Sequence, residues 1–382
     1  MSFIALVLMF MGKKINLSDR IIIREALNQN TMGGLVKLIK GIFVFTICFQ
    51  TIGAILLSIR FIPQYGVRLG IYYSIFHSIS AFCNAGVDIL GNNSFINYSH
   101  DYYINIVLMI LIIIGGLGFT VWNDIFRAIN LAIKRKFSPI RIWRELSIHT
   151  KLVLITTIIL LILGAILTFG FEKNNVNLGK DDTIGQRILK SCFYSTTLRT
   201  AGFTTINTKV LTTATKFISI IFMFIGGSPA STAGGIKNIT VAIILLMVAS
   251  FVKGNNETVV FKRKIPFRII KRAIAIFSIS ICIVLVAIIL LIITENLYME
   301  QRYNMIAENI NFIDIVYEVF SSFGAAGLTL DTTKKLSVLG RIIIMILMFI
   351  GRLGPITISI ALFNKNNKNK HINYPECDIL VG

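Results

Sequence analysis

Three short stretches of the 382-residue chain place a glycine in the same polar setting. They read SAFCNAGV at 80–87, TTLRTAGF at 196–203 and SSFGAAGL at 321–328. Each begins with a hydroxyl residue and ends in Ala-Gly and an apolar residue, and the glycines lie 116 and 125 positions apart. Glycine reaches φ values that other residues avoid, so such a loop can aim several backbone carbonyls at one point. Rings of these oxygens replace the hydration shell of a cation, and the chemistry that the pattern predicts is therefore cation coordination.

The elements that must position these loops repeat as well. A short amphipathic stretch precedes each loop, at 71–81, 186–197 and 312–322. Stretches of about 10–12 residues are too short to cross a bilayer but fit a re-entrant half-helix. The helix after each loop carries a glycine mark, which reads IIIGGLGF at 112–119, MFIGGSPA at 223–230 and MFIGRLGP at 348–355. The repeating unit is helix, half-helix, glycine loop, helix, and repetition on this scale indicates the architecture.

Long apolar runs predict an all-α polytopic membrane protein. The chain is 55% apolar and 15% charged, and its apolar runs lie at 41–59, 103–122, 152–171, 217–226, 239–252, 273–294 and 341–363. A membrane span needs about 20 such residues. Non-helical backbone at membrane depth is tolerated where it is buried in protein or lines a water-filled cavity, which predicts that the glycine loops line a central pore. The alternative is that the glycines only let helices pack closely; three loops in one register favour the pore.

The net charge of +20 is distributed as a membrane topology signal. Lysine and arginine gather in four segments, at 13–40, 134–151, 253–272 and 365–370, and most acids lie between them. Basic loops remain cytoplasmic, so these loops and the C-terminus are predicted to be inside. They could also contact anionic membrane lipid. This placement argues against nucleic acid as a partner.

Motifs of other functional classes are absent from the sequence. The five cysteines are scattered without a CxxC pair, so the sequence indicates neither a disulfide framework nor a zinc site. It contains no HExxH, GxSxG or P-loop motif. We therefore expect no enzyme and no metal beyond a transported ion.

Together these segments resemble the Trk/Ktr/HKT superfamily of potassium transporters, and within it the Ktr-type membrane subunits. The resemblance runs along the whole chain, through GKKINLSDRIIIREALNQ (12–29), SISAFCNAGVD (78–88), TTLRTAGFTTI (196–206), MFIGGSPASTAGGIK (223–237), SSFGAAGL (321–328), MFIGRLGPIT (348–357) and YPECDILVG (374–382). It implies M1–P–M2 units around one pore that takes up K⁺ across a bacterial plasma membrane, with Na⁺ coupling left open and no bound cofactor. It also implies a homodimer gated by a cytoplasmic RCK-type (KtrA-like) subunit.

The resemblance assigns a K⁺ selectivity filter to the glycine loops, formed by Cys83, Asn84, Ala85, Gly86, Arg199, Thr200, Ala201, Gly202, Gly324, Ala325, Ala326 and Gly327. Glycine at all three central positions favours K⁺, since sodium-selective relatives carry serine at one of them. Asn84 and Thr200 are expected to orient the loop backbone. Arg199 is expected either to brace the outer mouth of the filter or to lie in outer water.

Residues 226–237, GGSPASTAGGIK, interrupt an apolar helix and predict a flexible gate loop below the filter. Its candidate residues are Gly226, Gly227, Ser228, Pro229, Ser231, Thr232, Gly234, Gly235 and Lys237. A simple helix kink is the alternative. Lys237 is expected to snorkel to the cytoplasm or pair with an acid. By resemblance, Arg352 contacts this loop or lines the inner vestibule; alternatively it anchors its helix at the membrane interface.

The repeat divides the chain into five parts. Residues 1–34 are expected to end the inner helix of a first unit and form a cytoplasmic loop; residues 35–150, 151–266 and 267–364 form the second, third and fourth units; and residues 365–382 form a cytoplasmic tail. A spacing of 116 residues would place a further filter glycine before Met1, so an N-terminal truncation is expected. The alternative function is then a non-conducting membrane scaffold or relic that lacks the first pore quadrant.

Overall fold

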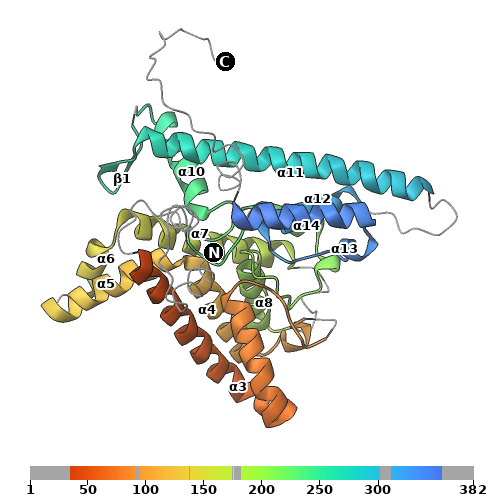
Figure 1. The fold of residues 1–382 in the computed structure, drawn as a ribbon, viewed down its shortest axis with the longest axis horizontal. Coiled ribbons are helices and arrows are strands. Elements are labelled where there is room, and N and C mark those ends of the chain that lie inside the picture. Colours follow the sequence, from red (N-terminus) through yellow and green to blue (C-terminus); the bar gives the residue numbers. More distant parts are fainter. Residues whose placement is uncertain are drawn as a thin grey trace, which may run out of the picture.

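The computed structural model describes residues 35–354, apart from 92–93, 137, 174, 176–181, 256 and 302–310. Helices make up most of the described part, as Figure 1 shows. Three of the described helices are long and apolar enough to cross a bilayer, Lys40–Phe82, Ile148–Phe171 and Phe267–Asn296, and a bent pair at 102–135 would make a fourth. The prediction of an all-α polytopic membrane protein is confirmed.

The described helices follow the predicted order three times. The first stretch comprises α3 (Leu35–Phe82), the 3₁₀ turn η1 (Ile96–Tyr98), α4 (Tyr102–Leu117), α5 (Phe119–Arg135) and α6 (Pro139–Glu145). The second comprises α7 (Ile148–Phe171), α8 (Ile184–Thr197), η3 (Thr208–Val210), α9 (Thr213–Phe224), α10 (Asn238–Val252) and an antiparallel hairpin of β1 (Val259–Val260) and β2 (Arg263–Lys264). The third comprises α11 (Phe267–Gln301), α12 (Phe312–Gly324), α13 (Thr332–Lys335) and α14 (Val338–Leu353).

The half-helices lie where the sequence predicts them. α8 and α12 are separate short helices, and the half-helix expected at 71–81 is the second part of α3, which follows a break at Gly66 with φ 78° and ψ 168°. The number of units in the whole chain and their residue boundaries remain predictions. The expected first-unit remnant at 1–34 and the tail at 365–382 lie outside the described residues.

The apolar run at 103–122 is not one straight helix, contrary to the simplest expectation from its length. α4 ends at Leu117, and α5 leaves it at an angle of 95°. The residue between them, Gly118, has φ 86° and ψ 148°, and Gly354 ends α14 in a similar conformation, with φ 86° and ψ 138°. Glycine tolerates this conformation because it has no Cβ. The glycine marks of the sequence therefore end two inner helices sharply.

A second glycine in the first and third marks lets the inner helix touch the half-helix of its own unit. A Cβ on Gly115 of α4 would clash with the carbonyl oxygen of Phe82, and one on Gly351 of α14 would clash with that of Phe323. Both phenylalanines stand four residues before a filter glycine. Small residues allow helices to approach closely in membranes. This contact fixes the depth of each half-helix against its inner helix.

The half-helices also pack against one another. Tyr194 of α8 and Tyr317 of α12 are fully buried, with their hydroxyl oxygens 3.4 Å apart, and the Tyr194 hydroxyl lies 2.9 Å from Ser219 Oγ of α9. Phe193 and Phe203 lie in a buried cluster with Phe95 that joins the first stretch to the second. The core of the fold thus surrounds the ends of the half-helices and holds the glycine loops between them.

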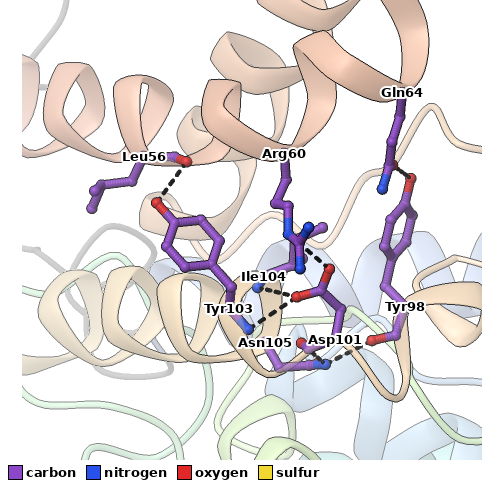
Figure 2. Close-up of polar contacts among 8 residues, drawn as sticks. All are labelled: Leu56, Arg60, Gln64, Tyr98, Asp101, Tyr103, Ile104 and Asn105. Atoms are coloured by element: carbon purple, nitrogen blue, oxygen red, sulfur yellow. Dashed lines mark hydrogen bonds and ion pairs between the residues drawn. The ribbon is translucent and has the colours of Figure 1, made fainter.

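In each unit, a polar contact joins the long helix to the start of the inner helix. Figure 2 shows this for α3 and α4. Asp101, the N-cap residue of α4, accepts hydrogen bonds from the backbone N–H groups of Tyr103 and Ile104 at 3.0 and 3.2 Å. Its carboxylate lies 3.3 Å from the guanidinium of Arg60 on α3. The cap satisfies helix N–H groups that have no partner within the helix.

The later stretches use a buried glutamate for the same connection. Glu172 follows α7 and accepts hydrogen bonds from the backbone N–H and Oγ1 of Thr212, the N-cap of α9, at 2.9 and 2.8 Å. Glu295 of α11 accepts from the N–H and Oγ of Ser337, the N-cap of α14, with the Oγ contact at 2.7 Å. Both carboxylates are buried, so each depends on these donors.

We predict that Ser337→Ala lowers the thermal unfolding temperature of the detergent-solubilised protein. The change removes the cap bond to the Gly340 N–H and one donor to the buried Glu295 carboxylate. A lost cap costs about 1 kcal/mol, and a lost hydrogen bond to a charged group about 1.5–3 kcal/mol. Ser138→Ala is the matched control, because Ser138 is an exposed N-cap residue that makes no side-chain cap bond. Equal unfolding temperatures for the two variants would contradict the prediction.

Candidate ion-binding site

The three filter glycines lie against one another, although they come from distant parts of the chain. A Cβ on Gly86 would lie 2.6 Å from the Cα of Gly202, and a Cβ on Gly202 would lie 2.7 Å from the Cα of Gly86. A Cβ on Gly327 would lie 3.3 Å from the Cα of Gly202. Gly202 therefore lies between the other two, and the structure brings the three predicted loops to one place. A side chain at Gly86 or Gly202 would not fit there.

The three loops share one backbone conformation. The residues two before each glycine have positive φ values: 49° for Asn84, 68° for Thr200 and 52° for Ala325. The glycines have φ values of 67°, 89° and 73° in the same order, whereas the alanine between each pair does not have a positive φ. A non-glycine residue with positive φ costs about 1–3 kcal/mol and is a sign of functional constraint. The same costly pattern in three loops indicates a shared role.

The intervening alanines show which way the peptide units face. The N–H groups of Ala85, Ala201 and Ala326 donate to carbonyl oxygens at the ends of their own half-helices at 2.9, 3.0 and 2.8 Å. In a trans peptide the carbonyl points opposite to the N–H. The carbonyls of Asn84, Thr200 and Ala325 therefore point away from their half-helices. They face the side of the loops opposite the half-helices, which we call the front of the loops.

Side-chain hydroxyl groups on two of the half-helices hold the loops that follow them. Ser80 Oγ donates to the carbonyl of Val87 at 2.6 Å, and Thr197 Oγ1 donates to that of Phe203 at 2.6 Å. The sequence pattern points to Thr196 as the hydroxyl of the second loop, but Thr196 Oγ1 donates within α8 to the Cys192 carbonyl. The neighbouring Thr197 makes the hydrogen bond to the loop instead, because its side chain points toward the loop at the end of the helix.

Two ionisable residues behind the loops were missed by the sequence reasoning. His77 and Glu318 each stand nine residues before a filter glycine and are almost fully buried. The N–H of Ile89 points at His77 Nε2 at 3.4 Å, and Glu318 accepts a hydrogen bond from Thr329 Oγ1 at 2.8 Å. Their shared position, nine residues before the glycine, is the signal that could have revealed them.

The loops after Gly202 and Gly327 are joined to each other. Thr208 Oγ1 donates to the Thr329 carbonyl at 2.6 Å, and Lys209 forms an ion pair with Asp331. The hydrogen bond from Lys209 holds the pKa of the Asp331 carboxyl below its usual range. The Asp331 carboxylate is therefore charged at neutral pH, and the ion pair ties the segments after Gly202 and Gly327 together.

The gate-loop segment, residues 226–237, touches all three glycine loops. Thr232 Oγ1 lies 3.0 Å from Asn84 Oδ1 and 3.1 Å from the carbonyl oxygen of Phe82. The N–H of Gly234 donates to Thr200 Oγ1 at 3.3 Å, and a Cβ on Gly234 would lie 2.6 Å from the carbonyl oxygen of Gly324. Asn84 and Thr200 thus bond to the gate-loop segment with the side chains that were expected to orient the filter backbone.

This segment is a closed loop and not a helix kink. It leaves α9 at Ile225 and returns beside it, because Ile225 and Ile236 form a parallel bridge and the Gly226 N–H donates to the Ile236 carbonyl at 2.8 Å. The Ser228 N–H donates to the carbonyl of Gly116 at the end of α4, at 3.0 Å. Its backbone groups are therefore satisfied by protein, as irregular structure at membrane depth requires.

Arg199 is buried against the gate-loop segment, so the expectation that it lies in outer water was wrong. Its side chain is 7% exposed, and Nη2 donates to the carbonyl of Gly226 in the gate-loop segment at 2.9 Å. Nη1 has no hydrogen-bond partner among the described residues, and Arg199 lines a small cavity with Thr157 and Thr196.

The other two cations also bond to carbonyls. Lys237 Nζ donates to the Ala233 carbonyl at 2.7 Å within the gate-loop segment, and in the described part of the chain it has no acidic partner. Arg352 Nη2 lies 3.4 Å from the carbonyl oxygen of Cys83, and its charge is close to that of Lys237. The expected acid pair of Lys237 is thus not found in this part, and Arg352 reaches the end of the first half-helix and not a carboxylate.

Comparison with known proteins identifies the family of the chain. The family model described as "TrkH: Cation transport protein" matches residues 1–372. The chain is 38% identical to the Ktr system potassium uptake protein B of Bacillus subtilis over 382 residues, which are 100% of this chain and 80% of that protein. It is also 38% identical to the potassium/sodium uptake protein NtpJ of Enterococcus hirae, over 97% of this chain and 77% of that protein.

A solved structure supports the fold independently. The crystal structure of the potassium transporter TrkH from Vibrio parahaemolyticus superposes with a TM-score of 0.68 at 18% identity, covering 90% of this chain and 68% of that one. Similarity at this level of identity speaks for the fold alone. The resemblance seen in the sequence motifs is confirmed by the family match over almost the whole chain. The chain belongs to the TrkH family of cation transport proteins.

Proposed function

We propose that the chain is the pore-forming subunit of a Ktr-type potassium uptake system and that K⁺ passes in front of the three glycine loops. The observation that carries this proposal is the alternation of positive φ at Asn84 and Gly86, repeated at Thr200 and Gly202 and in the third loop. It turns peptide carbonyls away from the half-helices, and such carbonyls replace the hydration shell of a cation.

The half-helices add a favourable field. α8, α12 and the second part of α3 all end at the loops. The C-terminal end of a helix carries a partial negative charge, which attracts cations. Conduction requires sites that bind a cation firmly enough for entry and weakly enough for exit. Neutral carbonyls with helix dipoles behind them meet both requirements.

Potassium is the proposed ion because glycine occupies all three filter positions and because the names of both relatives include potassium uptake. The name of one relative also includes sodium, which supports Na⁺ as a coupling or second ion. The name "Ktr system" supports a further subunit. We propose a cytoplasmic RCK-type regulator and a homodimer of the membrane subunit in the plasma membrane of a bacterium.

The gate-loop segment is proposed to close the pathway on the inner side of the filter. It bonds to two filter loops through Asn84 and Thr200, it lies against Gly324 of the third, and Arg199 clamps its first residue, Gly226. These contacts are few and mostly single hydrogen bonds, each with a net contribution of about 0.5–1.5 kcal/mol. A regulator that moves α9 or α10 could therefore displace the segment without unfolding the filter.

We predict that Gly202→Ala reduces ⁸⁶Rb⁺ uptake about tenfold or more in bacterial cells that lack their own potassium uptake. Alanine at φ 89° is strained, and its Cβ would lie 2.7 Å from the Cα of Gly86. Strain of about 1–3 kcal/mol would depopulate the binding conformation. Gly170→Ala is the matched control, since its Cβ would meet nothing within 4 Å.

Equal uptake by the Gly202→Ala and Gly170→Ala variants would refute the filter assignment. Membrane quantities of both variants are measured to exclude loss by misfolding. If the unmodified chain reaches the membrane and binds a regulatory subunit, yet never takes up Rb⁺, the non-conducting scaffold is the correct function.

We predict that Thr232→Val raises Rb⁺ uptake about two- to tenfold in the absence of a regulator. Valine preserves shape but removes the hydroxyl that lies 3.0 Å from Asn84 Oδ1 and 3.1 Å from the Phe82 carbonyl. Loss of a contact worth about 0.5–1.5 kcal/mol shifts the segment toward release by this factor. Thr156→Val is the control, because the Thr156 hydroxyl bonds only within α7. Unchanged uptake in the Thr232 variant would argue against a gate.

A further inference from the structure

We infer that α5 and α6 form an interfacial element that binds the headgroups of anionic phospholipids. In Figure 1 these two helices, coloured yellow, extend from the left side of the molecule. α5 leaves α4 at 95°. Because α4 is an apolar helix of the transmembrane bundle, a helix perpendicular to it runs along the membrane surface.

The sequence of α5 forms three stripes, each with a different environment. The first stripe is buried or half-buried in the protein and consists of Val121, Ile125, Ala128 and Ala132. The second stripe is shifted by one position along the sequence. It is apolar and accessible, and it consists of Trp122, Phe126, Ile129 and Ile133. The third stripe is shifted by one further position. It is polar and consists of Asn123, Arg127, Asn130 and Lys134. Successive stripes are about 100° apart on a helix, so α5 presents one face to protein, one to an apolar medium and one to water.

The helix is held in this orientation. Asp124 accepts hydrogen bonds from the Ser147 N–H at 2.8 Å and from Thr150 Oγ1 at 2.7 Å, both at the start of α7. Val121 packs in a buried cluster with Val153 of α7. α5 therefore cannot rotate to bury its accessible apolar stripe against its own chain.

This stripe is continuous with the lipid-facing surface of a transmembrane helix. Phe45 of α3 packs against Trp122 and Phe126, with ring centroids 5.5 and 6.0 Å apart. The neighbouring Val44 on α3 is 70% exposed, and Ile133 at the far end of the stripe is also 70% exposed. An apolar surface that runs from a spanning helix onto a perpendicular helix fits the boundary between acyl chains and headgroups.

Charge identifies the headgroup. α5 ends in three consecutive exposed basic residues, Lys134, Arg135 and Lys136, and Arg144 on α6 is also exposed. Basic clusters on amphipathic helices attract anionic lipid. Tryptophan prefers the membrane interface, and Trp143 on α6 is 42% exposed. A soluble protein partner would account for the charges, but not for apolar residues at the depth of the lipid boundary.

The two tryptophans of the chain, Trp122 and Trp143, both lie on this element, so intrinsic fluorescence reports on it alone. The full chain is reconstituted in phosphatidylcholine vesicles that contain equal fractions of acyl-brominated phosphatidylglycerol or acyl-brominated phosphatidylcholine. Bromine quenches tryptophan on contact. We expect both lipids to quench, with brominated phosphatidylglycerol enriched about fivefold at the tryptophans, which is the effect of about one basic side chain near an anionic surface.

Two variants with matched charge test the recognition. Lys134→Gln/Arg135→Gln/Lys136→Gln should retain quenching but lose the preference for phosphatidylglycerol. Lys262→Gln/Arg263→Gln/Lys264→Gln removes three exposed charges from the β1–β2 hairpin and should keep the preference. Absence of quenching by either lipid would overturn the proposal, because the stripe would then be covered by protein. Equal quenching by both lipids in the unmodified chain, or equal loss of preference in both variants, would overturn headgroup binding at this element.

Discussion

The structure depends on one constraint, which is that backbone polar groups outside helices must find partners within the protein when they lie at membrane depth. The glycine loops meet it by turning the N–H groups of Ala85, Ala201 and Ala326 back onto their half-helices. The carbonyls that remain face forward, where a cation can use them. The same constraint therefore leaves the carbonyls that we propose as cation ligands, and the gate-loop segment also bonds to the ends of α4 and α9 and to the filter loops.

The repeated units use the same few kinds of contact between their helices. Gly115 and Gly351 bring an inner helix against the last turn of its half-helix, and a capped helix start joins each inner helix to its long helix. The chemistry of that cap varies. The first stretch pairs Asp101 with Arg60, whereas the later stretches bury Glu172 or Glu295. The geometry is preserved because the inner-helix N–H groups need an acceptor, and an aspartate, threonine or serine can each supply it.

In and around the gate-loop segment, three cations donate hydrogen bonds to backbone carbonyls. Arg199 holds the start of the gate-loop segment, Lys237 holds its end and Arg352 reaches the carbonyl of Cys83. Of the three, Arg199 is buried, and a buried cation whose partner is a neutral carbonyl is costly, so small movements of the segment change its energy strongly. This arrangement supports the proposal that the segment is a movable gate.

The sequence by itself determined the fold class, the half-helices at α8 and α12, and the three glycines that meet, since these follow from local rules of hydropathy, length and backbone freedom. It also identified the gate-loop segment from its glycines and proline. It could not show that Arg199 bonds to the gate-loop segment, that His77 and Glu318 stand behind the loops, or that the run at 103–122 turns by 95° at Gly118. Those features depend on which residues distant in sequence become neighbours. Only tertiary packing decides this, because the same arginine, glutamate or glycine is stable in water, in a helix or against a carbonyl until its surroundings are set.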